Sequence, residues 1–391
     1  MYPINSDRLV RTFVDLASIS SPSWKEEGVI AYLTDALGAM GVSCERHPCG
    51  DSFNLLASVS GAVKRPSILL SAHMDTVVPC DNVRPVVRGG KIVSDGTTIL
   101  GADDKAAIAA FLEALASIRE RDMKHGPVEL LFSCAEEVGL SGIKGFDARV
   151  LRSRLGFVFD SSGPVGAIVV AAPYHLSFRL VVKGRAAHAG IEPEKGASAI
   201  RALGEIMATI PHGRIDAETT ANIGTIAGGR ATNIVADEAI CALEIRSRSK
   251  TKLAAVEARM RAVVDTVAHR HGVKVRVHRS LEYSGFSYRP SDPVVAAARR
   301  AIERIGLVPA LEASGGGSDT NVLNRAGIPS VALSVGMQKV HTTGECIRIR
   351  DLENAARLAM ALIDPEQADP AGRSRATTPR NRAASRNRRR R

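Results

Sequence analysis

Two polar residues, His73 and Asp75, stand one residue apart in the stretch SAHMDTV, directly after the apolar run SILL. Two interpretations fit this pattern. The pair can be the polar end of a strand that meets a solvated turn. It can also be a metal-binding histidine whose ring is held by a neighbouring carboxylate, a common arrangement around protein-bound metals. The pattern alone does not decide between them.

Further acidic residues follow other apolar runs. Glu136 and Glu137 follow PVELLFSCA, Asp160 ends LGFVFD, and Asp103 lies in GADDKAAIAAFLEALASIRE, where a turn precedes a helical pattern. Sites in open α/β sheets form outside the carboxyl ends of the strands, so we expect these residues to converge there with His73.

Together with His341, these side chains make a set of two imidazoles and several carboxylates. Such ligands suit zinc, manganese or cobalt. A carboxylate shared by two ions would hold them ~3.5–4 Å apart with a water between them. The Glu136–Glu137 doublet allows one carboxylate to bind metal while its neighbour acts as a general base.

The elements that must position these groups alternate along the chain. Residues 6–40 show two helical patterns separated by a Ser- and Pro-containing loop, and apolar runs then alternate with helical segments. This order predicts an α/β fold with a mostly parallel sheet.

From Tyr174 the order changes to strand, helix, strand, strand, helix, strand, which predicts an inserted α+β module of the ferredoxin-like kind. We expect a two-segment domain over residues 1–173 and 285–365, the inserted module over 174–284, and a tail over 366–391.

The composition bounds the class of protein. The chain has 391 residues, 45% of them hydrophobic, and no apolar run approaches the roughly 20 residues needed to span a bilayer. The first residues lack the features of a secretory signal. Six scattered cysteines without a C-x-x-C pair indicate reduced thiols. We therefore expect a cytoplasmic protein without a membrane partner.

The net charge of +11 comes mainly from one segment. Nine arginines and no acidic residue lie in PAGRSRATTPRNRAASRNRRRR, so the rest of the chain carries about +2 (11 − 9). We expect this Arg-rich tail to be disordered, and we expect no specific binding of nucleic acid.

Eight motifs occur in order: SAHMDTV, SDGTTILGADDKAAIA, AEEVGLSG, FDSSGPVG, KGRAAHAG, GGRATNIV, GGGSDTN and HTTGE. This series resembles the peptidase T-like zinc exopeptidases, of the superfamily that includes carboxypeptidase G, aminoacylase and acetylornithine deacetylase. The resemblance covers roughly residues 5–363, and its second motif is the most specific.

The resemblance implies that His73 and Asp160 bind one metal ion, that Glu137 and His341 bind the other, and that Asp103 bridges both. It also implies that Asp75 orients His73 and that Glu136 is the general base. Asp104 is acidic as well, so the bridging role of Asp103 depends on the alignment of GAD. Glu136 could otherwise be a solvated loop acid.

In similar enzymes the histidine that matches His188 reaches the active site, often from the partner subunit, and polarises the scissile carbonyl. Asn233 and Arg246 match positions that hold the substrate. Gly315 and Gly316 would let a peptide backbone approach closely. His188 could instead be a turn residue, and Arg246 a surface ion-pair partner. The remaining histidines are expected to be ordinary surface or packing residues: His47, His125, His175, His212, His269, His271 and His278.

Two departures from the family pattern stand out. Ala107 replaces a common glycine, a change that a helix tolerates. FSCAEE replaces the PDEE of true tripeptidases and puts a strict tripeptide preference in doubt.

We therefore predict an exopeptidase with two divalent ions, zinc in the first place and manganese or cobalt as alternatives. It would act on short peptides with aminopeptidase or tripeptidase specificity, as a homodimer through the inserted lid. An amidohydrolase that removes acyl or carbamoyl groups from amino acids is the alternative function, and a catalytically idle peptide-binding protein is the remote one.

Overall fold

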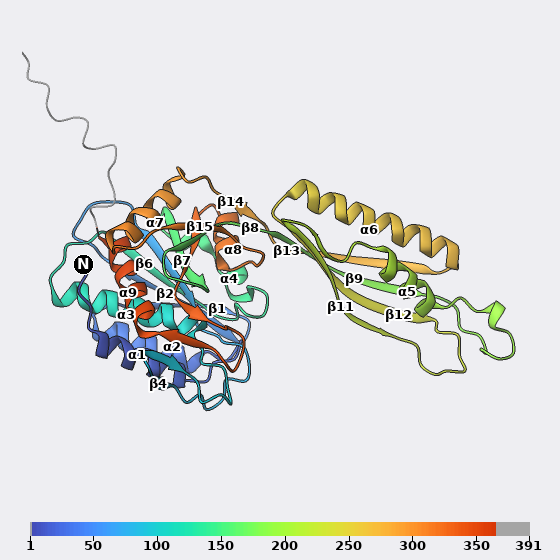
Figure 1. The fold of residues 1–391 in the computed structure, drawn as a ribbon, viewed down its shortest axis with the longest axis horizontal. Helices are drawn as coiled ribbons and strands as arrows, with labels where there is room; N and C mark the ends of the chain where they lie inside the picture. The colour runs from blue at the N-terminus through green and yellow to red at the C-terminus, as the bar shows by residue number, and fades with distance from the viewer. Residues whose placement is uncertain (1, 365–391) are drawn as a thin grey trace, which may run out of the picture.

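The structure, a computed structural model, describes residues 2–364. The Arg-rich tail predicted over 366–391 lies outside the described residues. Figure 1 shows two lobes joined end to end: a larger lobe of residues 2–173 and 284–364, and an elongated smaller lobe of residues 174–283. Among residues 2–364, no helix combines the length and the apolar character that a membrane crossing requires.

The larger lobe is built on a nine-stranded sheet with the order β1-β2-β6-β3-β7-β16-β8-β14, in which β15 also pairs with β8. Its central strands β6, β3, β7 and β16 run parallel, and antiparallel strands flank them. This arrangement confirms the predicted α/β class. The strands are β1 (Cys44–Cys49), β2 (Ser52–Val59), β3 (Ile68–His73), β6 (Val128–Ser133), β7 (Leu155–Ser161), β8 (Ala167–Ala172), β14 (Phe286–Ser287), β15 (Ala310–Ala313) and β16 (Ser330–Ser334).

Helices cover both faces of this sheet, so its central strands β6, β3 and β16 are buried throughout. Alternate residues of β3 show the division: Leu70 packs in the main core with α3 and α9, and Leu69 packs on the opposite face. The main face carries α1 (Ser6–Ser18), α2 (Glu27–Ala39), α3 (Ala102–Glu120), α7 (Pro293–Arg304) and α9 (Ile349–Ile363), and the other carries α4 (Ser141–Gly145) and α8 (Asp319–Arg325).

A small four-stranded sheet, with the order β17-β18-β5-β4, was not predicted. Its strands are β4 (Val86–Arg88), β5 (Lys91–Val93), β17 (Met337–Gln338) and β18 (Cys346–Arg348). Because β18 pairs with β5, the loop before β18 lies beside the segment that follows β5. This sheet therefore brings residues near 341 to residues near 100.

The smaller lobe holds a five-stranded antiparallel sheet with the order β10-β11-β12-β9-β13. Apart from the short β10, this is the ferredoxin-like order expected for the inserted module. The elements are β9 (Tyr174–Lys183), α5 (Ala199–Thr209), β10 (Gly213–Asp216), β11 (Thr219–Gly228), β12 (Glu238–Ser247), α6 (Lys250–His271) and β13 (Lys274–Tyr283).

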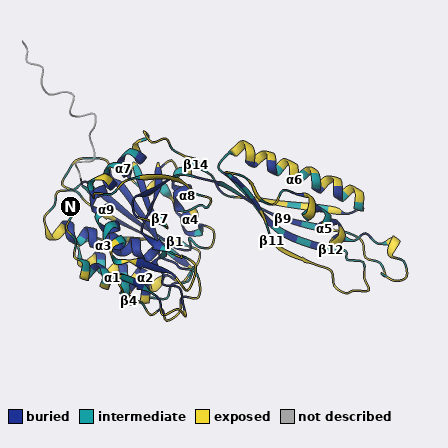
Figure 2. Cartoon of the chain, in the orientation of Figure 1, coloured by how far each residue is buried: buried dark blue, intermediate teal, exposed yellow. Residues whose placement is uncertain are grey.

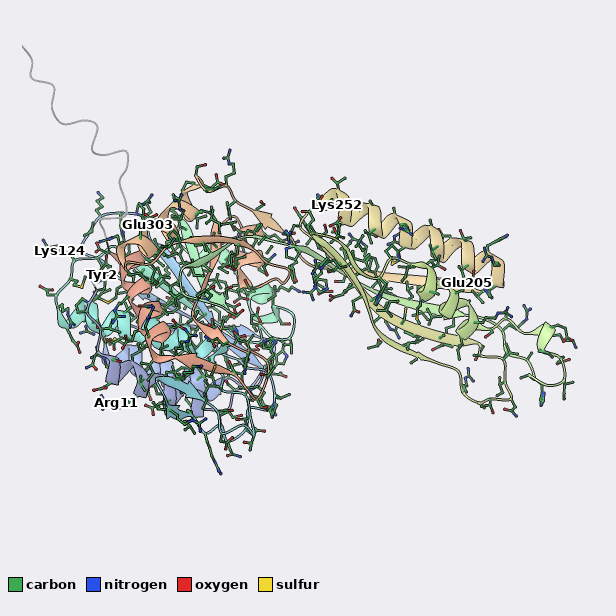
Figure 3. The ribbon with its side chains drawn as sticks, in the orientation of Figure 1. Tyr2, Arg11, Lys124, Glu205, Lys252 and Glu303 are labelled. Atoms are coloured by element: carbon green, nitrogen blue, oxygen red, sulfur yellow. The ribbon has the colours of Figure 1, made fainter. Side chains whose placement is uncertain are left out.

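Both helices of the smaller lobe pack on one face of its sheet, around a separate core that includes Phe178 and Leu203. Figures 1 and 2 show that the other face carries no helix. Figure 3 labels Lys252, at the start of α6, close to the junction with the larger lobe, and Glu205 on α5 farther out. The lobe thus has a near end at the junction and a far end that projects away.

Candidate active site

A cleft of about 350 Å³ lies at the carboxyl ends of the parallel strands, where the two lobes meet. Its walls come from strand ends of the larger lobe, from the Gly-rich loop before α8, and from the near end of the smaller lobe. The lining residues that the sequence analysis singled out are His73, Asp103, Glu136, Glu137, Asp160, Arg246, Gly316 and His341. The structure thus brings together most of the predicted site.

His73 is the last residue of β3 and only 2% of its surface is exposed. Its Nε2 atom lies 3.1 Å from Asp103 Oδ1 and 3.9 Å from Asp160 Oδ1. Its Nδ1 atom lies 2.9 Å from the main-chain oxygen of Asp75. With Nδ1 held by the main chain, Nε2 faces the two carboxylates.

The Asp103 carboxylate lies between two imidazoles. Its Oδ1 contacts His73, and its Oδ2 lies 3.4 Å from Nε2 of His341, which is itself 3.0 Å from Oε1 of Glu137. One carboxylate with an oxygen toward each histidine is the arrangement that a bridging ligand needs. Ligand atoms of His73, Asp103 and Glu137 all fall within 4.8 Å of one another.

The donor set fits divalent cations. Oε1 of Glu137 is buried and has no hydrogen-bond partner among residues 2–364, although the His341 nitrogen is only 3.0 Å away. Two such atoms, close together but outside hydrogen-bond geometry, suit a shared cation. Histidine nitrogens with carboxylate oxygens are also the ligands that zinc prefers.

The electrostatics also favour bound cations. Burial, reinforced by neighbouring carboxylates, raises the pKa of Asp160 and of Glu136 well above the ordinary values. Burial would likewise raise the pKa of Asp103, but the adjacent imidazoles of His341 and His73 outweigh it and lower that pKa. The neighbouring carboxylates of Asp103 and Glu137 raise the pKa of His341 to about 10. The acidic groups therefore draw positive charge into the cleft.

Asp75 is fully buried, and its carboxylate binds the main chain of the glutamate doublet, Glu136 and Glu137. Its carboxylate accepts hydrogen bonds from the main-chain N–H groups of Glu136 (2.9 Å) and Glu137 (3.2 Å) and from the Ser23 hydroxyl (2.6 Å). The nearer Asp75 carboxylate oxygen lies 3.5 Å from Nδ1 of His73. The carboxylate thus contacts the doublet more closely than the histidine that it was predicted to orient.

Asp104 lies beside the predicted bridging residue but has different contacts. Its Oδ2 accepts a hydrogen bond from the main-chain N–H of His73 (3.2 Å), and the side chain is completely buried. It also falls in a second group of potential metal ligands with His73 and Asp160. Only Asp103 extends between the two histidines.

The smaller lobe contributes a polar cluster to the cleft. Arg246 on β12 binds the Glu244 carboxylate through two parallel hydrogen bonds of 2.9 Å, and its Nη1 donates to the Tyr283 hydroxyl (3.3 Å). His175 lines the cleft, with Nε2 3.0 Å from Glu244 and its ring edge-on to Tyr283. His175, which was expected to be an ordinary surface or packing residue, thus lines the cleft, and so does Tyr283, which the sequence analysis did not single out.

The Gly-rich loop before α8 reaches the cleft through Gly316, Gly317 and Ser318, whereas Gly315 is not among the lining residues. Added side chains at positions 315 and 316 would meet little or nothing. At position 317 a Cβ atom would lie 2.3 Å from the Tyr283 ring. The close approach that requires glycine is thus the contact between Gly317 and Tyr283.

His188 and Asn233 lie together but away from this cleft. The main chain of Ala189 donates to the Asn233 carbonyl (2.9 Å), and His188 forms a bridge with Ile234. Both side chains are exposed. They follow the far ends of the strands, and eight residue steps of about 3.3 Å already separate His175 from Lys183 by roughly 26 Å along β9. Within one chain they do not reach the cleft.

Comparison with known proteins places this architecture in a family. The model for peptidase family M20/M25/M40 matches residues 69–364. The uncharacterized protein YqjE of Bacillus subtilis (strain 168) is 40% identical over 366 residues, 92% of this chain and 99% of that protein.

Two solved structures are similar as well. Aminopeptidase PepT from Bacillus cereus ATCC 10987 superposes with a TM-score of 0.87 at 40% identity, and a tripeptidase from Staphylococcus aureus subsp. aureus Mu50 with 0.88 at 38%. Both alignments cover 92% of this chain and 98% of the other. The chain therefore belongs to peptidase family M20/M25/M40, as a peptide-bond hydrolase of the peptidase T-like kind.

Proposed function

We propose that this chain is a dinuclear zinc exopeptidase that removes residues from short peptides with tripeptidase or aminopeptidase specificity. The observation that carries the proposal is the position of the Asp103 carboxylate, with one oxygen toward His73 and the other toward His341. The similarity to an aminopeptidase and to a tripeptidase supports the choice of substrate.

His73 and Asp160 would hold one ion, Glu137 and His341 the other, and Asp103 would contact both. Ions bound there would act as Lewis acids on the scissile carbonyl and lower the pKa of a water molecule. Zinc is the ion that this set of ligands favours, and manganese or cobalt would also suit it.

Glu136 is the general base in this proposal. Asp75 fixes its main chain while its side chain lines the cleft among the ligands. There its carboxylate can accept the proton of the attacking water and pass it to the leaving amine. The neighbouring Glu137 points instead at His341.

Arg246 and Tyr283 would bind the substrate at the lid side of the cleft. The Glu244 carboxylate engages Nε and Nη2 of Arg246, so Nη1 and the Tyr283 hydroxyl form the remaining polar edge. A fork-shaped cation next to a hydroxyl suits a peptide carboxylate or carbonyl. Gly315 and Gly316, where side-chain space is open, would lie along the peptide backbone.

His188 and Asn233 would act on the site of the partner subunit in a homodimer. Within residues 2–364, positions 222–228 of β11 pair with β12 on one side only, which leaves a free strand edge. Beside this edge, α5 and β11 line a groove of about 560 Å³, and Ile226 is 57% exposed.

Two such edges can pair around a twofold axis, which makes the strands antiparallel. The far end of one lobe then lies beside the near end of the other. This geometry supports delivery of His188 to the partner's cleft, where it would polarise the scissile carbonyl.

We further propose residues 1–173 and 285–365 as the catalytic domain and 174–284 as the lid and dimerisation domain. The separate cores around Leu70 and Phe178 support this division. We also propose that the enzyme acts in the cytoplasm. All six cysteines lie within the described residues and none forms a disulfide, in keeping with a reducing compartment.

A substrate panel tests the proposed reaction. The purified zinc-loaded protein is assayed with a tripeptide, a dipeptide, and the N-acetyl and N-carbamoyl forms of the same amino acid, with product detected by liquid chromatography. We expect the highest kcat/KM on the tripeptide. Preferred turnover of an N-acyl or N-carbamoyl amino acid would assign the chain to the deacylase alternative, and binding without turnover would indicate a peptide-binding protein.

A further inference from the structure

Glu345 is the buried last residue of the HTTGE motif, and it is neither a proposed metal ligand nor the proposed general base. It is 2% exposed and lies four residues after His341. Its Oε2 accepts hydrogen bonds from the main-chain N–H groups of Leu100 and Gly101, both at 2.8 Å, and its Oε1 accepts one from Asp103 at 3.0 Å. One side chain thus holds three amides from a segment more than 240 residues away.

Two of these amides lie just before α3 and the third lies in its first turn, where the amides of a helix have no partner within the helix itself. Gly101, at the N-cap position, has no side chain with which to cap them. Because this end of α3 is buried, Glu345 provides the acceptors that water would provide elsewhere. It thereby fixes the main chain of Asp103.

Glu345 is equally fixed to the loop that carries His341. Its own main-chain N–H donates to the Thr342 carbonyl (3.1 Å), and the next residue opens β18, which pairs with β5. The Ser94 hydroxyl, just after β5, donates to the Thr343 carbonyl (3.1 Å). The loop of His341 and the loop of Asp103 are therefore joined through protein contacts alone.

We propose that Glu345 is a positioning residue that presets the spacing between Asp103 and His341, so that a divalent ion meets ligands already in place. The inference rests on the proposed function, because it presumes that these residues bind ions. Outer partners of metal ligands typically change metal affinity or activity by about 10–100-fold when they are mutated.

A simple helix cap would have the same hydrogen bonds, so the test needs a matched control. Glu129 provides it: this residue is 4% exposed and accepts main-chain hydrogen bonds from Arg152 (3.0 Å) and Ser153 (2.8 Å). It lies near the start of β6, whereas the cleft lies at the other end of that strand. Glu345→Gln and Glu129→Gln therefore each disturb a buried carboxylate that binds backbone amides. Of these two carboxylates, only that of Glu345 contacts a segment that carries a proposed metal ligand.

Zinc affinity is measured by competition with a chromophoric chelator, and folding by circular dichroism. We expect Glu345→Gln to weaken binding of at least one ion by about tenfold or more, and Glu129→Gln to stay within about twofold of the native protein. Equal affinities in all three proteins, with both variants melting earlier, would show that Glu345 is only a cap. A native protein that binds no zinc would instead refute the proposed function.

Hydrogen exchange of the native protein tests the same point if Glu345→Gln does not fold. We expect the amides of Leu100, Gly101 and Asp103 to be protected in chelator-treated protein nearly as well as in zinc-loaded protein. Protection that arises only after zinc is added would overturn the proposal, because the spacing would then be set by the ion.

Discussion

The Asp75→Asn substitution would change the support of the glutamate doublet without removing any ligand. The native carboxylate has two oxygens for three donors: Oδ1 accepts the N–H of Glu136, and Oδ2 accepts the N–H of Glu137 and the Ser23 hydroxyl. An asparagine offers one oxygen and one NH2 group. At least one of the two amides must therefore face a donor.

The less costly orientation places the NH2 group at the Oδ2 position. There the Ser23 hydroxyl can rotate and accept a hydrogen bond, whereas the Glu137 amide loses its acceptor. A buried unsatisfied amide costs about 1–3 kcal/mol of stability. Because Glu137 is the proposed ligand, we expect metal affinity or turnover to fall about 10–100-fold, which corresponds to about 1.4–2.7 kcal/mol.

The assay measures zinc affinity, kcat and KM on a tripeptide, and thermal unfolding, for the native protein and Asp75→Asn. Glu113→Gln is the control, because Glu113 is also buried and accepts an amide (Asn5, 2.7 Å) and a hydroxyl (Ser117, 2.7 Å), farther along α3. We expect it to lose stability but keep zinc affinity. Asp75→Asn with native zinc affinity and native kcat would refute the reasoning.

Four further predictions address other parts of the site. Glu136→Ala should bind metal nearly normally but lose about 10²–10⁴-fold in kcat; loss of both ions, by elemental analysis, would make Glu136 a ligand. Asp103→Ala should bind clearly less than two ions per chain and Asp104→Ala should keep both, and the reverse would show that the alignment is off by one. Co-expressed His188→Ala and Glu136→Ala chains should form mixed dimers with partial activity; no recovery in verified heterodimers, or a monomer by sedimentation, would contradict delivery of His188 across the dimer. In chelator-treated protein, the pKa of His341 is raised from 6.5 to about 10, so this residue contributes stability that is fully present below pH 6.5 and is lost as the pH rises toward 10. Urea unfolding at pH 6.5 and 9.5 measures the change in the free energy of unfolding. A contribution of His341 to stability that increases with pH would refute this prediction.

The convergence of the ligands was predictable because it follows from parallel strands. His73 and Asp160 lie at the carboxyl ends of the neighbouring strands β3 and β7, and the glutamate doublet follows β6, so a parallel sheet places them along one edge. Their apolar runs identify the strands in the sequence. The topology of the smaller lobe was also predictable, because most of its strands and helices are long enough to show a regular pattern in the sequence.

Other parts of the site depend on contacts that leave no local pattern. Strands β17 and β18, of two and three residues, are too short to show a periodicity, yet their sheet brings His341 to Asp103. His175 and Tyr283 are ordinary residues of long strands, and only the junction of the lobes makes them part of the cleft. The remote position of His188 likewise follows from the length of β9 and not from the KGRAAHAG motif.

The central claim is that hydrolysis of short peptides depends on two ions held around Asp103. The most direct measurement is a zinc titration of chelator-stripped protein in which bound metal and tripeptide turnover are followed in the same samples. The account predicts that stripped protein is inactive and that turnover reaches its maximum as two ions bind per chain. Full turnover by stripped protein, or saturation at a single ion, would contradict it.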